Sequence, residues 1–375
     1  MMARRILVGA AAPLLAVVIA LLVTVLILAV SGSSVSGFVT TILSAPEDRN
    51  VVNIINNSSV LYLSALAAAI GFRMNLFNIG VEGQYRVAVF AAAVFAAQGW
   101  LPGPLNVVAA ILLAVLVGAL WAAIAGLLKV TRGVSEVIST IMLNAIAISV
   151  TAYLLRKWGV VVGNNLATET IPRDSWVPAL DIPFFDLPFL VDEAPNAVFG
   201  LAALAVLAGV LFWLVLNLTR FGFELRATGA SATAAIASGI DVRKMVVVSM
   251  VLSGAVAGLI GMPLLFGDTH SYSTTFQAGL GFTGIAVALL GRNNAIGMAF
   301  GAVLFAYLTE QSSLLEINAD VSNDIVAITQ GVMVLSVVIA YEVVRRYSVA
   351  QEQRAVARRL EQAESDDDTA EVAAR

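Results

Sequence analysis

Apolar runs of about 20 residues recur along the whole of this 375-residue chain, and they constrain its fold more than any other feature. Each run is long enough to cross roughly 30 Å of hydrocarbon as a helix. The runs are continuous, whereas the strands of a membrane barrel alternate apolar and polar residues over short segments. Hydrophobic residues make up 59% of the chain and charged residues only 12%. We therefore predict an all-α polytopic membrane protein.

About ten transmembrane helices are expected, and some of them are short or broken by glycine. The expected spans are 6–30, 58–75, 80–98, 105–128, 134–155, 196–217, 245–266, 277–291, 294–311 and 324–344. With the N-terminus inside, the inside loops carry Arg4, Arg5, Arg73, Lys129, Arg132, Arg220, Arg226, Arg243, Lys244, Arg292, Arg345 and Arg346. The outside loops then carry only Arg49, Arg156, Lys157 and Arg173. Because inside loops are enriched in Lys and Arg, this bias predicts an N-in, C-in topology.

The domain organisation follows from these spans. Residues 1–346 are expected to form one transmembrane permease domain, with an outside connection at 31–57, a long outside loop at 156–195 and an inside loop at 219–244. A cytoplasmic tail, 347–375, is expected to be partly disordered. The first apolar run has about 25 residues, against about 7–15 in a secretory signal core, so an uncleaved first span is favoured.

Composition and the absence of certain motifs exclude several enzyme classes. The chain has no cysteine and a single histidine, so thiol chemistry and a two-histidine metal motif are ruled out. None of the three lysines follows a glycine, which rules out a phosphate loop ending in Gly-Lys-Ser/Thr. The signatures of intramembrane proteases are also absent. Transport is the class that remains.

The stretch "GFRMNLFNIGVEGQYRVAVF", 71–90, interrupts the apolar pattern with polar residues. Asn78 is expected to cap a helix that begins near Gly80, and Glu82 would lie in its first turn, where the helix dipole favours a carboxylate. That explanation leaves Asn75, Gln84 and Arg86 unexplained. The functional alternative is a broken helix whose exposed backbone lines a water-filled path.

Two further polar clusters are candidates for the path. Glu136, Thr140 and Asn144 recur every four residues and therefore share one helix face. They form either a binding site for a polar solute or an interhelical hydrogen-bond seam, and the sequence leaves both open. In "FQAGLGFTGIAVALLGRNNAIG", 276–297, the glycines permit a broken or re-entrant helix. The path candidates in this stretch are Phe282, Thr283 and Asn293.

Other polar residues have simpler interpretations. A fourth cluster is expected around the last outside loop: Glu310, Gln311, Asn323, Asp324 and Gln330. His270, in "GDTHSYSTT", is expected to be an exposed loop residue. The pairs Gly254–Gly258 and Gly297–Gly301 are expected to allow close helix packing.

The inside loop 219–244 holds an Ala/Ser-rich run from Ala230 to Ser238, and Gly239 ends this run as a helix C-cap would. A short helix of small side chains, 230–239, suits a surface that must approach another protein closely. A merely solvated loop would not explain its composition.

Four stretches resemble one transporter family. "RATGASATAAIASGI" is similar to the coupling motif in permease subunits of ATP-binding-cassette importers. "FNIGVEGQ", "EVISTIMLN" and "GFTGIAVALLGRNNAIG" resemble signature stretches of the larger permease of bacterial nucleoside (basic membrane lipoprotein-type) importers, within the sugar and branched-chain amino acid permease superfamily. The resemblance runs from about residue 55 to 345. It departs at Ala295, where the family often has proline.

The resemblance implies a non-catalytic subunit in the bacterial inner membrane, paired with a second permease, a cytoplasmic ATPase and an external substrate-binding lipoprotein. ATP and Mg²⁺ would be bound by the ATPase, and this chain would bind neither a cofactor nor nucleic acid. The implied ATPase-coupling residues are Glu224, Arg226, Gly229, Ala230, Ala234, Ala235, Gly239 and Ile240. Nucleosides are the first choice of solute and simple sugars the second. An ion-coupled secondary transporter is the remaining alternative, since broken helices and a buried glutamate such as Glu136 also fit that class.

Overall fold

The computed structural model describes residues 18–30, 32, 34–162, 164–180, 197–319, 321–322, 324–336 and 339. It divides into two compact units, Ser34–Val326 and a smaller one made of Met1–Ser33 with Ala327–Arg375. The expected tail 347–375, the start of the first span and residues 181–196 of the expected outside loop lie outside the described residues.

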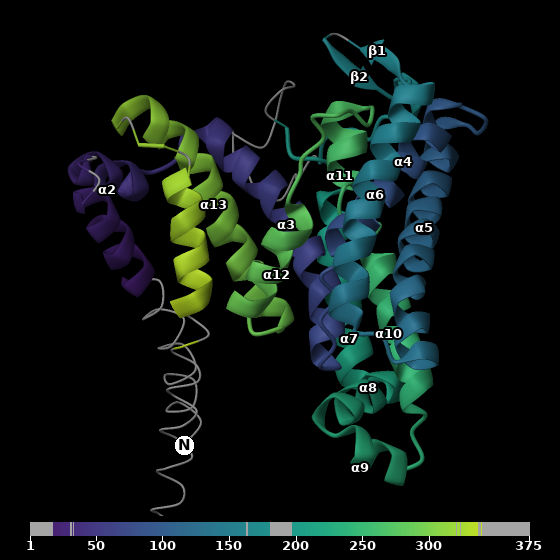
Figure 1. Ribbon diagram of the computed structural model, residues 1–375. Coiled ribbons are helices and arrows are strands. Elements are labelled where there is room, and N and C mark those ends of the chain that lie inside the picture. Colours follow the sequence, from purple (N-terminus) through teal and green to yellow (C-terminus); the bar gives the residue numbers. More distant parts are fainter. Residues whose placement is uncertain are drawn as a thin grey trace, which may run out of the picture. The chain divides into compact units, whose positions relative to one another are not determined.

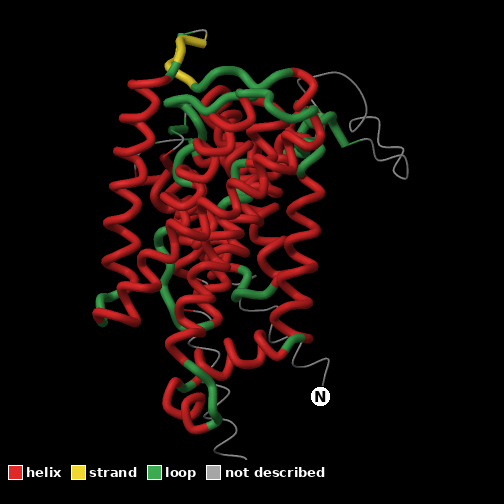
Figure 2. Tube along the Cα trace, turned by 90° about the vertical axis from the view of Figure 1, so that its right-hand side faces the viewer, coloured by secondary structure: helices red, strands yellow, loops and turns green. Residues whose placement is uncertain are grey.

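The regular secondary structure of the larger unit is almost entirely helical, as predicted (Figure 1). They are α2 (Val35–Leu43), α3 (Asp48–Arg73), α4 (Val81–Ala97), α5 (Gly103–Arg132), α6 (Glu136–Trp158), α7 (Ala202–Leu218), α8 (Arg220–Ala230), α9 (Ala232–Ala237), α10 (Val242–Ala257), α11 (Met262–Leu264), the π-helical turn η2 (Leu265–Thr269), α12 (Leu280–Leu290) and α13 (Ala295–Ala319). A short antiparallel hairpin, β1 (Val160–Val162) and β2 (Asn165–Ala167), and a 3-10 turn, η1 (Arg173–Ser175), complete the unit. The hairpin lies at one end of the unit and α8 and α9 at the other (Figures 1 and 2).

Several of these helices are long and apolar enough to cross a membrane. Four qualify singly within the described residues: Arg49–Arg73, Gly103–Arg132, Glu136–Trp158 and Val242–Thr269. The pair α7 and α8 qualifies together but bends by 73° at Thr219. Three shorter apolar helices are Val18–Val30, Leu280–Leu290 and Asp324–Ser336. The chain is therefore a multi-pass membrane protein.

Helix α3 forms the centre of the larger unit, and 83% of its apolar window is buried, against 28% for α5. Its run of alanines, including the fully buried Ala67 and Ala68, lets neighbouring helices approach closely. Helix α10 packs on α5 in the same way, because a Cβ at Gly254 or Gly258 would overlap the backbone of α5. Gly297 and Gly301 pack against the end of α12. The predicted close packing at both glycine pairs is thus confirmed.

Some expected boundaries are wrong. Helix α3 begins at Asp48, ten residues before the expected start at 58. Helix α13 continues to Ala319, so Glu310 and Gln311 lie inside a helix rather than around a loop. The reason is that their polar groups bond other helices: Asn53 donates to Glu310 at 2.9 Å, and Gln311 donates to the Thr41 carbonyl at 2.9 Å. Polar residues paired between helices resemble loop residues when only the sequence is read.

The smaller unit contains helix Val18–Val30 and most of helix Asp324–Ser336. The hydroxyl groups of Thr24 and Thr329 are hydrogen-bonded at 2.8 Å, and Thr24 also donates to the Ala20 carbonyl. A buried polar pair of this kind joins the first and last described helices of the chain.

Candidate functional site at two helix breaks

The first break, predicted for 71–90, lies between Arg73, which ends α3, and Val81, which begins α4. Asn75 has a φ of 57° and thus turns the chain out of α3, while the Leu76 amide donates back to the Gly71 carbonyl at 3.0 Å. The Asn78 side chain accepts the Gly80 amide at 3.0 Å. The N-cap residue itself is Gly80, so Asn78 holds the turn before α4 instead of capping the helix directly.

Buried amide side chains attach this break to the helices around it. Asn78 and Gln84 exchange two hydrogen bonds, at 3.1 and 3.0 Å. Asn78 also donates to the Ser253 hydroxyl of α10 at 2.8 Å, and Ser253 donates to the Ala67 carbonyl of α3 at 2.6 Å. Asn78, Gln84 and Ser253 are all at most 1% exposed. The break is therefore a packed structural element with satisfied polar groups.

The second break follows η2. Residues 271–279 form no regular helix, and α12 begins at Leu280 after Gly279, which has a φ of 83°. The span expected at 277–291 is thus three residues shorter at its start. Gly281 lies against the first turn of α4, because a Cβ at this position would overlap the backbone of Glu82. The first turns of α4 and α12 meet here.

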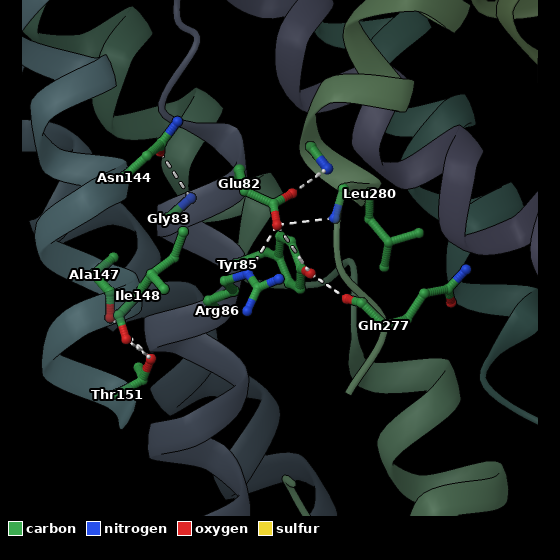
Figure 3. Close-up of polar contacts among 12 residues, drawn as sticks. Glu82, Gly83, Tyr85, Arg86, Asn144, Ala147, Ile148, Thr151, Gln277 and Leu280 are labelled. Carbon is green, nitrogen blue, oxygen red and sulfur yellow. Dashed lines mark hydrogen bonds and ion pairs between the residues drawn. The ribbon is translucent and has the colours of Figure 1, made fainter. Parts of the chain in front are cut away.

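Glu82 joins the two breaks (Figure 3). One of its carboxylate oxygens accepts from Arg86 Nε at 2.8 Å and from the Gly279 amide at 3.0 Å. The other accepts the Gly281 amide at 2.9 Å. Glu82 lies in the first turn of α4, as predicted, but it also accepts amide groups at the start of α12. Glu82 is only 2% exposed, so its carboxylate needs partners inside the protein. Arg86 and the N-terminal ends of α4 and α12 provide them.

Tyr85 adds a second link between the same segments, since its hydroxyl donates to the Gln277 carbonyl. Tyr85 was not among the predicted site residues. A signal for this pairing exists in the sequence, because "FNIGV", 77–81, and "FQAGL", 276–280, each place Phe, an amide residue and Gly before a helix. In both cases the glycine is the N-cap, Gly80 or Gly279.

The predicted stripe on α6 packs against the first break. Asn144 accepts the Gly83 amide at 2.8 Å and donates to the Ile79 carbonyl at 2.9 Å. Glu136 pairs with Lys129 and accepts the Phe77 amide at 3.4 Å. Thr140 is buried and donates to its own helix. In this structure the stripe forms the interhelical hydrogen-bond seam that was one of the two predicted alternatives.

A third junction lies at the end of the unit that carries α8. The Arg73 guanidinium donates to the Asn293 carbonyl at 3.0 and 2.7 Å, and Asn293 has a φ of 54° in the turn between α12 and α13. Gly229 of α8 packs against the end of α3, because a Cβ at this position would overlap the Arg73 carbonyl. The end of α3, the α12–α13 turn and α8 therefore meet.

The Ala/Ser-rich run forms α9, which covers 232–237 rather than the expected 230–239. Ser231 interrupts the helix, since its extended backbone starts a new turn and its side chain accepts the Ala234 amide at 3.3 Å. The C-cap residue of α9 is Ser238, and Gly239 follows it with a φ of 81°. The Ile240 amide donates to the Ala235 carbonyl, so the predicted stop at Gly239 is confirmed, one residue after the cap itself. Ala235 is buried and the rest of α9 is exposed, including Ala234.

The remaining predicted residues take no part in the hydrogen bonds described above. Glu224 pairs with Arg220 at 2.9 Å, Arg226 is half-buried and Ala230 is exposed. Phe282 is 51% exposed and Thr283 is half-buried on α12. Asn75 is exposed at the first break.

His270 lies in a loop, as expected, but it is half-buried and not exposed. Its ring stacks on Trp176 with centroids 3.6 Å apart and planes 5° apart. The Ile171 amide donates to the His270 carbonyl at 2.9 Å, so two segments distant in sequence form one layer near the hairpin. Burial lowers the pKa of His270, and the charge of Asp268 opposes this shift.

The comparisons with known proteins point to membrane transport. Residues 50–357 match the family described as the permease component of branched-chain amino acid transport systems. The guanosine ABC transporter permease protein NupP of Bacillus subtilis is 35% identical over 88% of this chain and 93% of its own length. The nucleoside ABC transporter permease protein NupB of Lactococcus lactis is 30% identical over 79% of this chain and 82% of its own length.

A sugar permease is also similar. The glucose ABC transporter permease protein TsgB13 of Haloferax volcanii is 30% identical over 77% of this chain and 76% of its own length. No solved structure matches the chain.

Proposed function

This chain belongs to the family of permease components of branched-chain amino acid transport systems, and from that premise we propose that it is the membrane subunit of an ATP-driven importer of nucleosides. The observation that carries the proposal is the near full-length similarity to a guanosine permease. Simple sugars are the second candidate solute, because a glucose permease is also similar.

The proposed topology has ten spans with both termini in the bacterial cytoplasm. It rests on the distribution of Lys and Arg between the expected loops. In this topology α8 and α9 face the cytoplasm and the hairpin faces outward. Since the chain has no cysteine, Ser238→Cys and Val161→Cys test this orientation in intact cells. An impermeant thiol reagent is expected to modify the second variant only, and modification of the first alone would reverse the topology.

The proposed partners are a second permease, a cytoplasmic ATPase that binds ATP and Mg²⁺, and an external substrate-binding lipoprotein. This chain binds no cofactor and no nucleic acid in the proposal, and it forms half of the path through the bacterial inner membrane. The exposed and small side chains of α9 support its role as the helix that docks on the ATPase. Glu224, Arg226, Ala230, Ala234, Ala235 and Ile240 lie on or beside this coupling segment.

The junction of Gly229, Arg73 and Asn293 supports a route for coupling. A movement of α8 imposed by the ATPase would reach the first break through Gly229, and the Arg73–Asn293 contact would carry it to the end of α12 that lies opposite the second break. Both breaks are joined again at Glu82. In this proposal, Asn78, Gln84, Glu136, Thr140 and Asn144 support the path by holding the breaks in place. ATP binding would then shift the permease between two states that differ in their affinity for the ATPase partner.

The experiment that tests the proposal uses the complete transporter reconstituted into vesicles. Radiolabelled guanosine is expected to accumulate only when ATP, Mg²⁺ and the binding lipoprotein are present. Accumulation of glucose but not of guanosine would show that the solute is a simple sugar and not a nucleoside. Uptake driven by an ion gradient without ATP would overturn the proposal.

A further inference from the structure

We propose that residues 275–283 form the solute-facing wall of the translocation path and bind an uncharged solute with a flat apolar face, such as a nucleoside. This inference rests on the proposed function and assigns a surface to it. The residues involved are Thr275, Gln277, Ala278 and Phe282.

The first step concerns depth in the membrane. Helix α12 has 11 residues and therefore a length of about 16 Å. One end of α12 is the turn at 291–294, which faces the cytoplasm in the proposed topology. Since the hydrocarbon core is about 30 Å thick, the start of α12 lies near the middle of the membrane. The segment that precedes Leu280 crosses the outer half without forming a helix.

The second step concerns the backbone of this segment. The amide groups of Thr275, Gln277 and Ala278 donate to no residue within the described part of the chain, whereas the Gly279 amide donates to Glu82. Thr275 and Ala278 are exposed and Gln277 is half-buried. Lipid cannot satisfy free backbone amides, so irregular backbone at this depth must be covered by protein or line a water-filled cavity.

The third step concerns the side chains. The Gln277 side chain points away from Glu82 (Figure 3), and its carboxamide has no hydrogen-bond partner among the described residues. Phe282 lies in the first turn of α12 and exposes 51% of its surface. Free amides, a hydroxyl and a carboxamide can bond the hydroxyl groups and base edge of a nucleoside, while an aromatic ring can stack on its base.

The fourth step concerns charge. The stretch "STTFQAGLGFTG", 273–284, contains no charged residue. Behind it, the Glu82 carboxylate is already compensated by Arg86 and by the start of α12. The helix end that elsewhere attracts an anionic solute is therefore occupied by a carboxylate of the chain itself. A wall of this kind favours uncharged nucleosides over nucleotides.

The test uses single cysteines in the complete transporter, since the natural chain has none. Thr275→Cys and Ala278→Cys are treated with a charged, water-soluble thiol reagent in membrane vesicles. Phe300→Cys is the matched control, because Phe300 is 75% exposed on α13 in an apolar groove beside Ile296 and Val303. We expect modification of the first two variants but not of the control, and guanosine with its binding lipoprotein should slow that modification several-fold.

Absence of modification at 275 and 278 would mean that the segment contacts the second permease or lipid, and would overturn the proposal. Modification that solute does not slow would also overturn it. The uptake assay first identifies the solute that the unmodified transporter accumulates, and protection from the thiol reagent is then measured with that solute. A wrong solute class is therefore distinguished from a wrong assignment of the path wall.

Phe282→Leu provides an independent readout, with Phe300→Leu as its control. Loss of stacking at position 282 is expected to raise the KM for guanosine about tenfold with little change in the maximal rate. A purely structural role for Phe282 would lower the maximal rate and leave KM unchanged, which contradicts the proposal. GMP is expected to compete poorly in the unmodified transporter.

Discussion

The Glu82 carboxylate accepts the Gly281 amide at 2.9 Å, although 199 residues separate the two positions. This contact joins the first turn of α4 to the first turn of α12 and so ties the two helix breaks together. Both residues are buried. Their backbones lie so close that a Cβ atom on residue 281 would overlap the backbone of Glu82. The geometry of each break therefore depends on the other.

Replacing Glu82 is expected to destabilise the protein and abolish uptake. Glu82→Ala leaves Arg86 without its carboxylate partner and two amides of α12 unpaired, and breaking a buried ion pair costs about 3–5 kcal/mol. Thermal unfolding in detergent and guanosine uptake by the assembled complex measure the effect. Glu169→Gln, at an exposed position near the hairpin, is the control. Normal uptake by Glu82→Ala would exclude a role for Glu82 in transport.

Gly281→Ala is expected to prevent correct packing of α12 on α4, because the added Cβ would meet the Glu82 backbone, which cannot move aside. The measurement is the yield of assembled complex and its unfolding temperature. Gly331→Ala is the matched control, since no atom lies within 4 Å of a Cβ there. That variant should be neutral or stabilise its helix by up to about 1 kcal/mol. Equal behaviour of the two variants would show that the close approach is unimportant.

Gly229 is expected to be needed for coupling. Gly229→Ala and Gly229→Val place increasing volume against the Arg73 carbonyl and should separate α8 from the first break. Uptake per ATP hydrolysed is expected to fall in that order, while ATP hydrolysis by the complex continues. Asn217→Ala, at an exposed position of α7, should leave the ratio unchanged. If Gly229→Val left uptake per ATP hydrolysed unchanged, coupling would not depend on the contact between Gly229 and Arg73.

Asn144 is expected to hold α6 against the first break. Asn144→Leu removes both hydrogen bonds and leaves the Ile79 carbonyl and the Gly83 amide unpaired. A buried polar group without a partner costs about 1–3 kcal/mol, so the unfolding temperature should drop clearly. Met142→Leu, on the exposed face of the same helix, is the control. A drop no larger than that of the control would mean that water replaces the lost bonds.

The stability of the outer layer near the hairpin is expected to depend on pH through His270. Because burial lowers its pKa in the folded protein, the unfolded chain binds more protons just below the ordinary histidine value of about 6.5. Stability is therefore full above that value and falls as the pH decreases below it. His270→Phe keeps a stacked ring on Trp176 but cannot titrate.

The measurement is the unfolding temperature of both forms between about pH 7.5 and pH 5. The unmodified protein should lose stability relative to His270→Phe as the pH falls. Parallel curves would show that protonation of His270 costs the folded protein no free energy and would contradict the prediction.

Local sequence pattern was sufficient to predict the class of the protein and several of its local features. Apolar length predicts membrane helices, the polar stretch 71–90 predicts the first break, and the glycines of 276–297 predict the second. Gly239 predicts the end of α9. These features depend on burial length and on backbone conformations of neighbouring residues, so a short window of sequence carries them.

The sequence alone could not identify the partners of the polar residues. Glu310, Gln311 and the start of α3 were expected near loops, and His270 in an open loop, because a polar residue paired across helices has the same local pattern as a solvated one. Glu82 has a sufficient local explanation in the dipole of its own helix, yet it also accepts amides at the start of α12. Which groups pair is decided only when segments distant in sequence pack together, since each buried hydrogen bond needs a partner at one distance and angle.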